Sequence, residues 1–131
     1  MSGGETGPLV YVVDDDDAVR DSLRLLFKSV DMPVRIFADA ESFLAGLDRG
    51  RPGCLVCDVR MPGTGGLELQ ARMEADGLTT PIIFITGHGD VPMAVDAMRK
   101  GAVDFLQKPF DDDDLLDRVR QALSGDTDHP D

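Results

Sequence analysis

Basic residues are scarce in this sequence. Among its 131 residues there are 13 Lys and Arg against 25 Asp and Glu, which gives a formal net charge of -12. Proteins that bind nucleic acids hold the phosphates largely with Lys and Arg. The charge therefore opposes direct nucleic-acid binding by this chain itself.

Long apolar runs are absent as well. No stretch approaches the roughly 18 apolar residues of a membrane span, and the opening MSGGETG has neither the positive region nor the apolar region of a signal peptide. We therefore expect no membrane-spanning segment and a cytoplasmic location. The length and the 42% hydrophobic content fit one soluble domain, which we place at residues 8–124, with flexible tails at 1–7 and 125–131.

Cysteine is limited to two residues, Cys54 and Cys57, in the apolar segment CLVC. Residues three apart in a strand point to opposite faces of the sheet. The two thiols are therefore poorly placed to pair or to chelate one metal. We expect them to be buried and free, in a reducing compartment.

Short apolar segments alternate along the chain with segments of helical periodicity. The predicted strands span residues 9–13, 34–37, 54–57, 82–86 and 103–106. A helix is expected after each strand, and Asp39 and Asp90 are the expected N-caps of the second and fourth helices. This alternation is typical of an α/β fold in which helices cover both faces of a parallel sheet. Right-handed crossovers favour a doubly wound, flavodoxin-like five-stranded sheet of order 2-1-3-4-5.

Acidic residues follow two strands that this order makes neighbours. Asp14 and Asp15 come directly after the first strand and Asp58 after the third, so they flank the crevice where such sheets bind ligands. Carboxylates about 4 Å apart repel by roughly 4 kcal/mol at an effective dielectric near 20, which favours a cation among them. A few hard oxygen ligands suit Mg²⁺. Flavin binding is disfavoured because the loop after the first strand reads DDDD.

Two more polar side chains are expected at the same edge of the sheet, Thr86 after the fourth strand and Lys108 after the fifth. An aspartate can act as a nucleophile toward phosphorus. A lysine and Mg²⁺ can offset the charge of a transferring phosphoryl group, and a threonine hydroxyl can donate to one of its oxygens. Asp58 is the candidate nucleophile because it stands alone at the end of a central strand.

Four segments carry a family resemblance: VVDDDD, CDVRMPG, FITGHGDVPMAV and GAVDFLQKPF. In this order, across roughly residues 8–123, they resemble the receiver domain of bacterial two-component response regulators, and the last two resemble its FixJ-like branch. The resemblance implies that a cognate sensor histidine kinase phosphorylates Asp58. It also implies that Asp15, Asp58 and the backbone carbonyl of Arg60 ligate Mg²⁺ directly, with Asp14 acting largely through water.

The resemblance assigns the remaining roles. Thr86 and Lys108 would contact the phosphoryl oxygens, Phe105 would act with Thr86 as a switch, and the Lys108-Pro109 bond would be cis. The site would catalyse only its own phosphorylation and dephosphorylation, so the chain would be a switch rather than a turnover enzyme. Phosphorylation would favour a homodimer through the face made by the fourth helix, the fifth strand and the fifth helix, and would control an output or partner, with transcription the leading candidate.

The acidic residues allow two other interpretations. A magnesium-dependent aspartyl-phosphate phosphohydrolase, as in the haloacid dehalogenase-like family, is the enzyme alternative, but that family needs a second acid two residues after the nucleophile, where this chain has Arg60. Asp16, Asp17 and the second run at 111–114 are interpreted as helix starts, where aspartates cap amides and meet the positive end of the helix dipole.

Overall fold

The computed structural model describes residues 7–87 and 89–124, and within them five strands alternate with five helices. The elements, in chain order, are β1 (Leu9–Val13), α1 (Asp17–Ser29), β2 (Val34–Phe37), α2 (Ala40–Gly46), β3 (Gly53–Asp58), α3 (Gly66–Ala75), β4 (Ile82–Thr86), α4 (Val91–Arg99), β5 (Asp104–Gln107) and α5 (Asp112–Ser124). All neighbouring strands are parallel and the sheet order is β2-β1-β3-β4-β5, so the predicted fold is confirmed.

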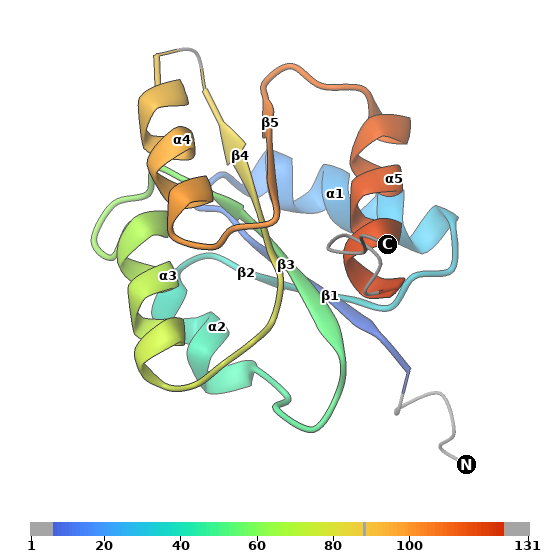
Figure 1. Ribbon diagram of the computed structural model, residues 1–131. Helices are drawn as coiled ribbons and strands as arrows, with labels where there is room; N and C mark the ends of the chain where they lie inside the picture. The colour runs from blue at the N-terminus through green and yellow to red at the C-terminus, as the bar shows by residue number, and fades with distance from the viewer. Residues whose placement is uncertain (1–6, 88, 125–131) are drawn as a thin grey trace, which may run out of the picture.

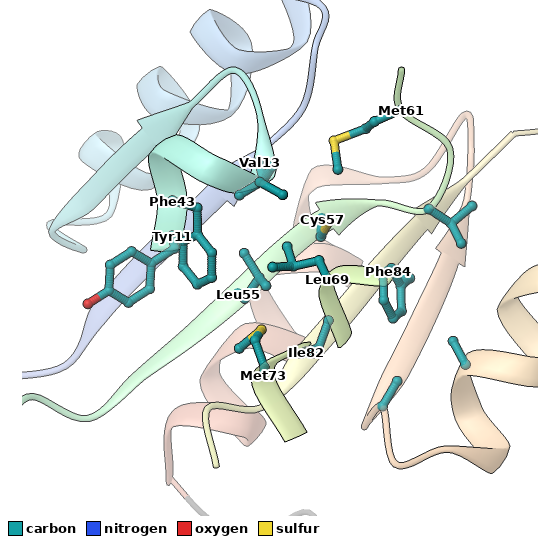
Figure 2. Packing of buried hydrophobic residues seen from close by; sticks show 14 of the residues in the cluster. Tyr11, Val13, Phe43, Leu55, Cys57, Met61, Leu69, Met73, Ile82 and Phe84 are labelled. Carbon is teal, nitrogen blue, oxygen red and sulfur yellow. The ribbon is translucent and has the colours of Figure 1, made fainter. Parts of the chain in front are cut away.

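Helices cover both faces of the sheet. In Figure 1, α1 and α5 lie on one side, and α2, α3 and α4 on the other. Figure 2 shows the core on the second side, where Phe43 of α2 and Leu69 of α3 pack over Tyr11 and Leu55 of the central strands. The burial of such side chains on both faces supplies the main stabilisation of the sheet.

The two cysteines lie on opposite faces of β3, as the sequence predicts. Cys57 belongs to the core under α2, α3 and α4, and Cys54 to the core under α1 and α5. Both thiols are buried and free. Burial raises the pKa of Cys54 to about 12, so this thiol stays protonated and unreactive at neutral pH.

The strand register sets the positions of the strand ends. Val13 is the partner of Cys57 across β1 and β3, so Asp14 and Asp58 follow side by side. Asp58 is the partner of Ile85 on β4, which places Thr86 one residue further toward the same edge. β3 includes Asp58 itself, whereas β5 begins and ends one residue later than predicted.

The start of α3 packs closely against the end of β3. A Cβ on Gly66 would lie 2.8 Å from the Phe84 ring and 2.9 Å from the Asp58 carbonyl oxygen. Only glycine therefore fits at this contact without a shift of the backbone. The loop that follows Asp58 is consequently held close to the edge of the sheet.

None of the helices in residues 7–87 and 89–124 is long and apolar enough to cross a membrane. The flexible tails predicted at 1–7 and 125–131 lie, apart from Gly7, outside the residues that the structure describes.

Candidate functional site

Three carboxylates meet at the carboxyl ends of β1 and β3. One oxygen from each of Asp14, Asp15 and Asp58 lies within 4.8 Å of the other two. Asp14 is buried, Asp58 is partly buried and Asp15 is exposed. Among the residues that the structure describes, this is the only group of three or more potential metal-ligating side chains so arranged.

Asp14 is the most buried of the three acids, with 2% of its surface exposed. Its Oδ1 accepts a hydrogen bond of 2.9 Å from the backbone N–H of Asp16. Burial, and to a smaller extent the charges of Asp58 and Asp15, raise the pKa of Asp14 to about 6 against the lowering effect of that hydrogen bond and of Lys108. Ionised Asp14 is thus unfavourable unless a positive charge lies beside it.

Arg20 of α1 holds the backbone at the end of β1. Its Nη1 donates to the Asp14 carbonyl oxygen at 2.6 Å, and its Nη2 pairs with the Asp17 carboxylate. Asp16 caps α1 by accepting from the N–H of Ala18. Arg20 is not among the site residues that the sequence predicts. The three-residue spacing from Asp17 could have indicated the ion pair, but nothing in the sequence indicates the bond to the Asp14 carbonyl.

Asp58 has a donor on each of its carboxylate oxygens. The backbone N–H of Arg60 donates to Oδ1 at 3.0 Å, and Lys108 Nζ lies 3.3 Å from Oδ2. The same Lys108 ammonium lies 3.9 Å from Asp14 Oδ2. A lysine from the end of β5 thus reaches the acids of β1 and β3. The Lys108-Pro109 bond is cis, as the resemblance implies.

Thr86 lies one residue past Ile85, the partner of Asp58 on β4, and Phe105 lies on the neighbouring strand β5. Thr86 is fully buried, and its hydroxyl donates to the Gly87 carbonyl at 3.1 Å. The Thr86 carbonyl accepts the Lys108 N–H at 2.8 Å, which ties β4 to the lysine. Phe105 is partly buried against the core under α2, α3 and α4.

The Arg60 side chain pairs with Asp90, just before α4. Its Nε and Nη2 both donate to Asp90 Oδ1, at 3.0 and 2.8 Å. Asp90 occupies the predicted N-cap position of α4, but its side chain makes no capping hydrogen bond to that helix. Asp90 is thus the N-cap residue as predicted, but its carboxylate accepts from Arg60 and not from the first amides of α4.

The donor set fits a small divalent cation. Three carboxylates supply hard oxygen ligands, two of them on adjacent strand ends, and one of the three is buried with a raised pKa. A cation at this cluster would offset the burial and the smaller repulsion that raise this pKa, and Mg²⁺ prefers such ligands in small number. The remainder of its coordination would be open to water and phosphate oxygens.

Comparison with known proteins decides the family. Residues 10–120 match the family model described as the response regulator receiver domain. The chain belongs to the response regulator receiver domain family. Receiver domains of the FixJ type are its relatives: it is 53% identical over 114 residues to the transcriptional regulatory protein FixJ of Bradyrhizobium diazoefficiens, covering 87% of this chain and 56% of FixJ.

Two further similarities agree with this family. The response regulator protein TodT of Pseudomonas putida is 47% identical over 115 residues, covering 88% of this chain and 51% of TodT. The crystal structure of FixJ-N superimposes with a TM-score of 0.82 at 41% identity, covering 94% of this receiver domain and 95% of FixJ-N. The chain therefore spans about half the length of these curated relatives and nearly all of FixJ-N.

Proposed function

We propose that this receiver domain accepts a phosphoryl group on Asp58 from a cognate sensor histidine kinase. The observation that carries the proposal is that the Asp58 carboxylate lies beside both the Lys108 ammonium, at 3.3 Å, and the acids that follow β1. A nucleophile, a cation for the phosphoryl oxygens and a set of metal ligands thus come from three different strand ends.

In the reaction, an oxygen of the Asp58 carboxylate attacks the phosphorus of the phosphohistidine. The P–N bond breaks and its electron pair remains on the imidazole nitrogen. Lys108 already contacts Asp58, so its ammonium is placed to follow the new phosphoryl oxygens. The Arg60 N–H orients the carboxylate through Oδ1.

Asp15, Asp58 and the Arg60 carbonyl would hold Mg²⁺ directly, and Asp14 largely through water. When bound, Mg²⁺ would offset the charge of the transferring phosphoryl group. Asp14 supports this assignment because its raised pKa marks a buried carboxylate that lacks sufficient positive charge nearby. Arg20 positions the same residue by its bond to the Asp14 carbonyl.

The outcome of phosphorylation is a conformational change of the domain rather than the release of a product. Relatives of this domain are transcriptional regulators, which supports transcription as the output of the protein that contains it. The Thr86 hydroxyl would leave the Gly87 carbonyl for a phosphoryl oxygen, and Phe105 would turn inward. The change favours a homodimer through the face of α4, β5 and α5, where Val95 and Met98 of α4 are 40% and 36% exposed. No nucleic acid or membrane contact is assigned to this chain.

Intact mass tests the chemistry. We expect acetyl phosphate with Mg²⁺ to add one phosphoryl group to the wild type and none to Asp58→Asn, because an amide has no nucleophilic carboxylate oxygen. Asp111→Asn is the matched control and should be modified like the wild type. Peptide mapping that placed a stable acyl phosphate on another aspartate would show the assignment to be wrong.

Sedimentation tests the switch. Beryllofluoride, which imitates the phosphoryl group, should shift the wild type toward a dimer. Thr86→Ala should still bind it but should dimerise less, because the hydroxyl that couples the phosphoryl group to β4 is gone. A wild type that stays monomeric with the mimic, and shows unchanged amide exchange over residues 89–106, would rule out this switch while leaving the chemistry at Asp58 intact.

A further inference from the structure

Arg60 connects the loop after the phosphoacceptor to the first turn of α4. Its guanidinium makes two hydrogen bonds to Asp90 Oδ1, and Nη2 lies 3.5 Å from the sulfur of Met93. Asp90 is the N-cap residue of α4 and Met93 lies in its first turn. A single side chain therefore links two segments that are 30 residues apart in the sequence.

The two partners differ in how easily they can move. The Asp90 side chain is 16% exposed, whereas the Arg60 side chain is 67% exposed. Arg60 can consequently change partners by rotating in solvent, without repacking the core. Asp90 cannot follow it, because its backbone carbonyl accepts the N–H groups of Met93 and Ala94 at the start of α4.

Arg60 also lies close to the phosphoacceptor. Its own backbone N–H donates to Asp58 Oδ1, so its side chain begins beside that carboxylate. The pKa of the Arg60 guanidinium is raised first by the hydrogen bond to Asp90 and also by the charge of Asp58. The guanidinium therefore bonds to Asp90 in the unphosphorylated chain and is also within the electrostatic influence of Asp58.

Phosphorylation would alter this competition. A phosphoryl group on Asp58 brings more negative charge and oxygens that suit a guanidinium fork. Resting on the function proposed above, we propose that Arg60 exchanges Asp90 for the phosphoryl group on Asp58 and thereby releases the start of α4. This route differs from that of Thr86, whose hydroxyl donates to the Gly87 carbonyl, the same oxygen that accepts the backbone N–H of Asp90.

The proposed exchange predicts that substitutions at Asp90 and at Arg60 change the affinity for beryllofluoride in opposite directions. Asp90→Asn frees Arg60, so it should raise the affinity for beryllofluoride by about threefold, the scale of an exposed ion pair. Arg60→Gln removes the donor and should lower this affinity by a similar factor. A purely structural ion pair would shift both variants in the same direction, because each breaks the same contact.

The double variant separates exchange from simple charge. If Arg60 carries the effect, Asp90→Asn should change nothing in the Arg60→Gln background. If only the charges near the site matter, the two effects should add and the double variant should return to the wild-type affinity. Fluorine NMR titration of beryllofluoride in the presence of Mg²⁺ measures all four proteins, and Arg72→Gln is the control because it breaks another exposed ion pair, with Glu41.

Amide exchange at the start of α4 gives the second measurement. Beryllofluoride should raise exchange over residues 90–95 in the wild type, and Arg60→Gln should show the raised exchange without the mimic. Additive affinities, or exchange over 90–95 that Arg60→Gln leaves unchanged, would overturn this exchange while leaving phosphorylation of Asp58 in place. A wild type that neither binds the mimic nor is phosphorylated would overturn both proposals.

Discussion

The sequence DDDD occurs twice in this chain, at residues 14–17 and 111–114, and the two copies have different surroundings. The first follows β1, which lies between β2 and β3, so its first residue is buried and meets Asp58 of the neighbouring strand. Its third residue, Asp16, caps α1. One run is thus divided between a candidate metal site and a helix start, as the sequence analysis predicts.

The second run lies after β5, at the edge of the sheet, and three residues separate it from the strand. All four of its aspartates are exposed. The Asp111 carbonyl accepts the N–H groups of Asp114 and Leu115, and the Asp114 carboxylate pairs with Arg118 one turn later. The run forms the start of α5. Two identical DDDD segments therefore have different chemical roles, because they differ in their distance from a strand end and in which strand is adjacent to that end.

Magnesium binding should separate the two runs most strongly. Asp15→Ala should weaken Mg²⁺ binding by at least about 100-fold, since it removes a proposed direct ligand. Asp113→Ala removes the same charge from the other run and should change binding by less than about twofold, because only general electrostatics is altered. Titration of both variants at matched ionic strength decides. Equal losses would mean that net charge, not ligation, distinguishes the runs.

The second largest difference between the two acidic runs should appear in how the free energy of unfolding depends on pH. Asp14 has a pKa of about 6 in the folded chain and an ordinary value of 3.8. A raised carboxyl pKa favours the folded state at low pH, and this advantage is lost as the pH rises through about 6. Without Mg²⁺, Asp14→Asn should therefore raise the free energy of unfolding by about 2 kcal/mol at pH 7.5 and by nearly nothing below about pH 4.

Asp112→Asn is the control for this measurement, and it should change the free energy of unfolding by less than about 0.5 kcal/mol at either pH. Urea unfolding at the two pH values gives the comparison. Added Mg²⁺ should stabilise the wild type more than Asp14→Asn. A stabilisation by Asp14→Asn that is equal at both pH values would contradict burial of the ionised carboxylate as its cause.

Substitution of the arginine beside each acidic run should give the smallest difference between the two runs. Arg20 bonds to the Asp14 carbonyl, whereas Arg118 joins Asp114 to Asp104 of β5. Arg20→Gln and Arg118→Gln should each lower the free energy of unfolding by about 1 kcal/mol. Only Arg20→Gln should also weaken Mg²⁺ binding, by about fivefold, since it loosens the backbone that carries Asp14 and Asp15. Unchanged binding would make Arg20 a purely structural residue.

Much of the candidate site follows from local pattern. Asp14, Asp58 and Thr86 each stand at or just past the end of a short apolar strand, and parallel strands bring such ends to one edge. Lys108 was predicted on the same ground, and its ammonium does reach Asp58. The switch role of Phe105 and the ligand role of the Arg60 carbonyl stay predictions that rest on the family resemblance.

The ion pair of Arg60 with Asp90 was not predicted. The sequence predicts Asp90 as the N-cap of α4, a position where an aspartate side chain commonly accepts from the first backbone amides. In the structure its carboxylate accepts from Arg60 instead. N-cap preferences describe hydrogen bonds between neighbouring residues. They contain no information about a long side chain, such as that of Arg60, that extends from another loop.

The sequence alone determined the order of strands and helices, the edge where the acids gather and the division of the first acidic run. These follow from periodicity and from the chain direction of parallel strands, which are properties of neighbouring residues. Only the tertiary structure decided how deeply Asp14 is buried, that Arg20 bonds to its carbonyl and which acid Arg60 pairs with. Desolvation and the reach of arginine side chains depend on segments that meet only after folding, so no local pattern records them.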